Sequence, residues 1–271
     1  MLLFTVLKGR GDTPALRLAR LQGVLHSALQ TSGNRRRLRL AGLGTAKDID
    51  ALKCPFTALE RLQVLPRGEF FGAPRQFLNT RRITIRTASI RHPILVHPAP
   101  KVTVLCHGVE RDTRRLAQSG AETVAAPVST LRRLAREIES GAIDPAPFSH
   151  SVIAFTDLDQ GEVSEGDRAL FWRAFQVPIF EQYLGLDGSL LAGECEAHSG
   201  VHVEPENAIW EVIDSELVVT SLTDRQYPTL RLGTGWTAHL DLGPCDCGKP
   251  TPRLLNMARL GVPLAFAAGA N

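Results

Sequence analysis

The chain has 271 residues, a formal net charge of +3, 44% hydrophobic residues and 22% charged residues, as expected for a soluble globular protein with one core or two packed ones. No apolar run reaches the ~18 residues of a membrane span, which argues against a membrane partner. The arginine clusters at 35–39 and 132–136 lack neighbouring aromatic residues, which argues against a nucleic-acid partner. The N-terminus lacks signal-peptide features, and five cysteines in tight local spacing suit metal better than disulfides. We therefore expect a cytoplasmic protein.

Residues 1–85 are predicted to form an N-terminal helical segment. Residues 13–30 carry leucine and valine at helical spacing, and Thr13 is a candidate N-cap. A glycine-containing loop follows. Residues 45–50 then predict a short helix that ends before Pro55.

Residues 86–190 are predicted to form an α/β core, because strand and helix patterns alternate along them. Such alternation implies a parallel sheet with helices on its faces. The predicted strands are 83–85, 101–106, 122–126, 151–155 and 177–183, and the predicted helices are 110–119, 129–140 and 164–175.

Residues 191–256 read as a small β-rich subdomain in which helix patterns are absent. Residues 257–271 follow it as a short tail. The predicted strands of this stretch are 201–203, 208–213, 216–220, 229–232 and 237–242.

Two short stretches of this subdomain offer a set of metal ligands. Cys195 and His198 form a Cys-x-x-His pair, and Cys245 and Cys247 form a Cys-x-Cys pair. Three thiols and one imidazole match a closed tetrahedral zinc site, and the strands between the pairs can bring them together. His202 competes with His198 as the fourth ligand. We prefer His198, because Cys-x-x-His is a common ligand step and His202 lies in a strand pattern.

A series of motifs follows in a fixed order along the chain, at 143–145, 177–183, 194–203, 216–223, 228–235 and 244–254. This series resembles the phenylacetate–coenzyme A ligase family of adenylate-forming enzymes, which includes coenzyme F390 synthetase-like proteins. The resemblance implies the core of an adenylate-forming large domain. It also implies an acyl or aryl carboxylate as ligand, with ATP, Mg²⁺ and coenzyme A as the other reactants.

Two departures from the family pattern concern the nucleotide. The family's phosphate-binding loop is rich in serine, threonine and glycine, whereas residues 86–93 contain no glycine, so the backbone is not suited to wrap a phosphate. Where the family has an aspartate for the ribose hydroxyls, this chain has Trp236, which offers a donor and no acceptor.

Two further departures concern magnesium and the catalytic lysine. The family's Tyr-Gly-x-Thr-Glu motif is replaced here by a sequence from Tyr183 through Gly185 to Asp187. The resemblance makes these three residues and Arg231 candidate cofactor-binding residues, while the alternative for Asp187 is a capping residue in a turn. The resemblance also implies a small C-terminal domain with a catalytic lysine, for which we expect no counterpart here. Lys249 belongs to the cysteine loop, so no catalytic residue is assigned.

Three functions remain open from the sequence. The first is a degenerate ligase homologue, a pseudoenzyme that binds an acyl or aryl carboxylate or a protein partner, including a second copy of itself. The second is an acid–coenzyme A ligase that works with a complementary chain. The third is a zinc-stabilised interaction module. The altered nucleotide motifs favour the first or third, and the preserved motif order favours the first or second.

Overall fold

The structure is a computed structural model that describes residues 14–82, 88–91, 93, 100–105, 120–143, 148–158 and 163–260. The chain divides into two compact units. Unit 1 comprises Met1–Arg82, Ala208–Gly243 and Pro250–Asn271, and unit 2 comprises Ile83–Asn207 and Pro244–Lys249. The predicted divisions followed chain order, whereas each unit combines separate stretches. Several predicted features lie wholly or partly outside the described residues: the strand at 83–85, the loop region at 86–93, the helix at 110–119, the motif at 143–145 and the tail at 257–271.

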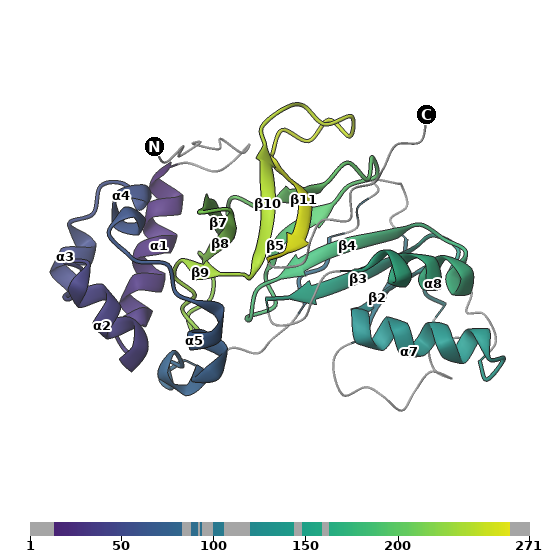
Figure 1. Cartoon of the computed structure of the whole chain (residues 1–271), viewed down its shortest axis with the longest axis horizontal. Coiled ribbons are helices and arrows are strands. Elements are labelled where there is room, and N and C mark those ends of the chain that lie inside the picture. The colour runs from purple at the N-terminus through teal and green to yellow at the C-terminus, as the bar shows by residue number, and fades with distance from the viewer. Residues whose placement is uncertain are drawn as a thin grey trace. The chain divides into compact units, whose positions relative to one another are not determined.

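Unit 1 combines a helical layer with short antiparallel strands (Figure 1). A core of leucines from the helices packs with Ile209, Leu222 and Leu230. The short helix predicted at 45–50 is α3, and a capping box between Thr45 and Asp48 begins it. The helices are α1 (Pro14–Ala28), α2 (Ser32–Leu40), α3 (Ala46–Asp50), α4 (Pro55–Glu60) and α5 (Arg67–Gly72), followed by the 3₁₀ turn η1 (Pro74–Gln76).

The strands of unit 1 form two antiparallel groups. One is a sheet of β7 (Ala208–Ile213), β8 (Glu216–Ser221) and β9 (Leu232–Gly233). The other is the ladder of β10 (Trp236–Asp241) with β11 (Arg253–Arg259). The sequence pattern predicts β7, β8 and β10 closely but not β11.

Unit 2 contains the predicted parallel sheet, which is confirmed. Its strands lie in the order β1-β2-β3-β4-β5-β6; the first four pair in parallel, and β5 and β6 are antiparallel. The strands are β1 (Val102–Val104), β2 (Thr123–Pro127), β3 (Ser151–Asp157), β4 (Ile179–Leu184), β5 (Leu190–Glu194) and β6 (Val201–Val203).

Two helices, α7 (Val128–Glu139) and α8 (Glu165–Phe175), cover one face of this sheet (Figure 1). Alternate residues of β2 and β3, such as Val124 and Val152, join Leu131 and Phe171 in the core beneath these helices. The intervening Ala125 and Ile153 belong to a separate cluster with Leu184 and Leu190, as strand alternation requires.

The β-rich stretch that was expected to form one subdomain is divided between the units. Because β5 pairs with β4 and β6 with β5, the start of the stretch extends the parallel sheet of unit 2. Residues 208–243 instead belong to unit 1, and Pro244–Lys249 returns to unit 2. Within the described part of the chain, no helix has the length and apolar character needed to cross a bilayer.

Candidate metal centre

The hairpin of β5 and β6 supplies two of the four clustered side chains. Cys195 follows the last residue of β5, and His202 is the central residue of β6, where it pairs with Gly193. The loop 244–249 supplies Cys245 and Cys247. It closes with a hydrogen bond from the Gly248 backbone N–H to the Cys245 carbonyl at 2.8 Å. Gly248 has φ +74°, a conformation that favours glycine because it has no Cβ.

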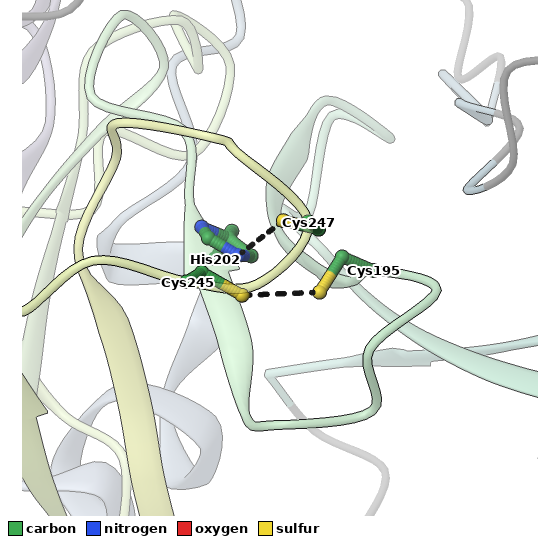
Figure 2. Close-up of side chains that lie close together, drawn as sticks. All are labelled: Cys195, His202, Cys245 and Cys247. Atoms are coloured by element: carbon green, nitrogen blue, oxygen red, sulfur yellow. Dashed lines mark hydrogen bonds between the residues drawn. The ribbon is translucent and has the colours of Figure 1, made fainter.

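The ligand atoms of Cys195, His202, Cys245 and Cys247 all lie within 4.8 Å of one another. Figure 2 shows the sulfurs of Cys195 and Cys245 facing each other, at 3.7 Å, and Cys247 facing the His202 ring, with Sγ 3.3 Å from Nε2. Zinc bonds of ordinary length at tetrahedral angles separate two sulfurs by ~3.8 Å, and a sulfur from a nitrogen by ~3.6 Å. The cluster therefore has nearly the spacing of a tetrahedral zinc site.

The cluster is largely shielded from water, because Cys195, His202 and Cys245 are buried and Cys247 is half-buried. Burial opposes ionisation of the Cys245 thiol, yet the Ser199 hydroxyl and the Cys247 backbone N–H lower its pKa to about 5. Burial and the neighbouring sulfurs raise the pKa of Cys247 to about 11. The thiolate is the form in which a cysteine binds a metal.

His198, the histidine preferred from sequence, does not join the three thiols. Its backbone N–H bonds the Cys195 carbonyl at 3.0 Å, closing a tight turn in which His198 has φ +48°. Its ring stacks on Phe180 at 4.7 Å, and its Nδ1 lies 3.6 Å from a Glu194 oxygen. The structure therefore brings His202 to the cluster in its place. Spacing in the sequence does not distinguish the two histidines, because the pairing of β6 with β5 is what positions His202.

A buried acidic pair lies behind the cysteine turn. Arg168 Nη2 is 3.1 Å from a Glu194 oxygen and 3.4 Å from a Glu181 oxygen. Burial raises the pKa of Glu181 to about 7. Burial also opposes the charge on Glu194, but His198 and Arg168 outweigh it and lower the pKa of that carboxyl. Sequence reasoning missed this group, because its members are far apart along the chain.

The candidate residues from Tyr183 to Asp187 lie at the end of β4 and in the turn to β5. Tyr183 is only 2% exposed and hydrogen-bonds Glu181. Asp187 Oδ1 accepts from the Ser189 hydroxyl at 2.6 Å and the Ser189 backbone N–H at 3.1 Å, and Gly185 bonds Ser189 across the turn. This is the geometry of an Asx turn, the alternative that the sequence left open for Asp187.

Arg231 lies in unit 1 and is 6% exposed. Its Nε and Nη2 each donate to one Glu211 carboxylate oxygen at 3.0 Å. Its Nη1 donates to the backbone carbonyls of Leu59 and Leu62. Four hydrogen bonds to protein acceptors leave at most one of its five N–H donors for a ligand.

The fold of the chain resembles that of solved CoA-ligase structures. Three solved structures of 2-hydroxyisobutyryl-CoA ligase resemble the chain. The open form with 2-HIB-AMP and CoA has a TM-score of 0.64 at 14% identity, covering 92% of this chain and 69% of that chain. The thioesterification state has a TM-score of 0.64 at 15% identity, covering 91% and 68%. The postadenylation state with 2-HIB-AMP has a TM-score of 0.61 at 14% identity, covering 92% and 67%.

No family model and no curated protein matches the sequence. At such low identity the likeness shows the fold, and it does not distinguish the phenylacetate–coenzyme A ligase family from other adenylate-forming ligases. The expectation of an adenylate-forming ligase core is confirmed at the level of the fold.

Proposed function

We propose that the chain is a zinc-stabilised protein with the fold of adenylate-forming ligases that works by binding, and that it does not make acyl-adenylates on its own. Its ligand is a carboxylate compound or a partner protein. The observation that carries this proposal is that the candidate nucleotide-binding residues make hydrogen bonds within the protein. Arg231 forms a buried ion pair with Glu211, and Asp187 accepts hydrogen bonds in a turn.

The proposed zinc ligands are Cys195, His202, Cys245 and Cys247. Four protein ligands fill a tetrahedral shell, so the metal has a structural role and no open position for a reacting group. Zinc at this point fastens the loop 244–249 to the β5–β6 turn. Unoxidised thiols of this kind persist in a reducing compartment, which supports the proposal of a cytoplasmic protein.

Trp236 supports the proposal that the chain does not form acyl-adenylates on its own. It occupies the position at which the resembling family has a ribose-binding aspartate, and it is 5% exposed. Its backbone N–H bonds the Thr234 hydroxyl at 3.2 Å. A buried indole in place of a carboxylate supplies no acceptor for the ribose hydroxyls, so ATP loses one of the contacts that would orient it.

The proposal is tested by incubating the full chain with ATP, Mg²⁺, coenzyme A and a panel of aryl and fatty acids. We expect no pyrophosphate release, and calorimetric ATP binding no tighter than about millimolar, roughly −4 kcal/mol. Micromolar ATP binding, or pyrophosphate release with any acid, contradicts the proposal.

The fold itself favours a second candidate, an acid–coenzyme A ligase completed by another chain. The structural neighbours are described with acyl-AMP and CoA ligands, and a complementary chain would have to supply the contacts that this one has replaced. The same assay distinguishes the two functions when a candidate complementary chain is added. Pyrophosphate release that appears only in the mixture supports the ligase.

A further inference from the structure

One face of α2 presents three arginines and a leucine around a cavity of about 320 Å³. The cavity is lined by Ser32, Arg35, Arg36, Arg39 and Leu40. Their spacing of three, four, seven and eight residues from Ser32 places them on one side of the helix. We call these five residues the α2 basic face.

The opposite side of α2 attaches the helix to unit 1. Leu38 and Asn34 are fully buried. Asn34 donates to the Pro228 carbonyl at 2.9 Å, and Arg37 donates to the Leu230 carbonyl at 3.0 Å and to the Asn34 side chain. Because these contacts anchor the helix, the α2 basic face is not needed to hold it in place.

The charges of the α2 basic face are not neutralised within the described part of the chain. Arg35 donates from Nε to the Leu29 carbonyl, which carries no net charge. Arg36 and Arg39 are exposed, and neither has an ion pair among the described residues. Since α2 contains no acidic residue, Arg35 and Arg36 repel Arg39 at four- and three-residue spacing. An acidic partner would relieve this repulsion.

Leu40 adds an apolar element at the end of the same face. It is 78% exposed, more than any other large hydrophobic side chain that the structure describes. Arg39 precedes Leu40 directly, so a partner that pairs with the arginines can also cover this leucine and remove its apolar surface from water.

We propose that the α2 basic face docks an acidic segment of a partner protein that carries an apolar side chain. A free phosphate would use the arginines and leave Leu40 unused. A membrane-binding helix needs a broad apolar side, and this face has one large apolar residue. Single-stranded nucleic acid needs aromatic platforms, and the cavity lining has none. Arginine clusters commonly recognise acidic motifs. The inference rests on the proposed function in that partner binding is the role given to the chain.

The test uses the full-length protein and a fluorescent synthetic peptide with glutamates on one helical face and a single leucine. We expect saturable binding that weakens as salt is raised. Arg36→Glu and Arg39→Glu should each weaken binding at least about tenfold, and Leu40→Ser should weaken it several-fold. Arg136→Glu on α7 is the matched control, since Arg136 is also an exposed helical arginine, and it should leave binding unchanged.

Three outcomes would overturn the docking proposal. The first is that the peptide does not bind at millimolar concentration. The second is that the Arg39→Glu variant binds the peptide as tightly as the wild type. The third is that a peptide with serine in place of its leucine binds equally well, while inorganic phosphate or anionic vesicles compete strongly. Thermal melts of each variant establish that it is folded. Pyrophosphate release by the wild type would instead contradict the proposed function and leave the peptide result standing, so the two failures are distinguishable.

Discussion

The buried ion pair of unit 1 and the cysteine–histidine cluster of unit 2 are both compact groups of polar side chains, but they differ in how fully the protein satisfies them. In the ion pair, Arg231 makes four hydrogen bonds, and both Glu211 carboxylate oxygens accept from it. In the cluster, the Cys195 and Cys245 sulfurs are 3.7 Å apart, and Cys247 Sγ lies 3.3 Å from His202 Nε2.

This difference suggests a structural role for the ion pair and a ligand-binding role for the cluster. A buried polar group whose hydrogen bonds are complete has little capacity left for a ligand. Three thiols and an imidazole gathered at tetrahedral spacing gain little from one another and much from a metal ion. We therefore propose a structural role for Arg231 and metal binding for the cluster, and the predictions below test that assignment.

The largest effect is expected from removing the metal or one thiol. Structural zinc in small sites contributes on the order of 10 kcal/mol of binding free energy that is coupled to folding. Chelation, or Cys245→Ser, should therefore lower the melting temperature by more than about 10 °C. Cys54→Ser is the control, because Cys54 lies outside the cluster. A purified wild type without metal, together with a Cys245→Ser variant that melts at the wild-type temperature, would contradict the assignment.

Breaking the ion pair should have the next largest effect. Glu211→Ala leaves the Arg231 guanidinium buried without its carboxylate, which costs about 3–5 kcal/mol of unfolding free energy. The double variant Arg231→Met/Glu211→Leu removes both charges and should recover most of that loss. Urea unfolding measures both. A loss of unfolding free energy below about 1 kcal/mol for Glu211→Ala would contradict the structural role given to the Arg231–Glu211 pair.

Trp236→Asp tests whether unit 1 retains a latent nucleotide site. Replacing a buried indole with a carboxylate removes apolar packing and buries a charge, so we expect a loss of about 3 kcal/mol and no ATP binding. Trp236→Phe, which keeps an aromatic ring, should lose less. Calorimetry and thermal melting measure the two properties. Unchanged melting with new ATP affinity would show that a single lost contact had been mistaken for a lost function.

The smallest effect is expected at the partly exposed pair of Arg132 and Asp167. It shows how much an ion pair near solvent contributes to stability, for comparison with the buried pair of Arg231 and Glu211. The Arg132 hydrogen bond is the main reason that the pKa of Asp167 falls from 3.8 to about 2. Since the folded pKa is the lower one, the pair stabilises the fold above pH 4, and this contribution is lost as pH falls toward 2. Asp167→Asn should lower the free energy of unfolding by only about 1 kcal/mol at pH 7, because solvent screens the half-exposed arginine. The difference in unfolding free energy between the variant and the wild type should shrink at pH 2. A difference that stays constant with pH would exclude the ion pair as its cause.

Helices and strands with a clear periodicity of apolar residues were predictable from the sequence. The patterns at 151–155 and 164–175 identify β3 and α8 to within two residues at each end, because core packing requires their apolar spacing. The sequence does not predict α2, α4, α5, β5 or β11. α4 and α5 have six residues each, too few to be stable without tertiary contacts. In α2 the only apolar residue that enters the core is Leu38.

The candidate site was predictable where it depends on local spacing. The Cys245 and Cys247 pair is recognisable from sequence, and Cys195 completes the three thiols. The histidine depends on the pairing of β5 with β6, a non-local feature that spacing alone does not reveal. The role of Arg231 likewise depends on the Leu59 and Leu62 carbonyls, more than 160 residues away in the chain.

The most direct test of the account is the metal content of protein purified without added zinc, compared between wild type, His202→Ala and His198→Ala. The two variants make the same chemical change four residues apart, so they differ only in which imidazole is lost. We predict one zinc per chain in the wild type and in His198→Ala, and a loss of bound zinc in His202→Ala. A wild type without metal, or zinc retained by His202→Ala and lost by His198→Ala, would contradict the central claim.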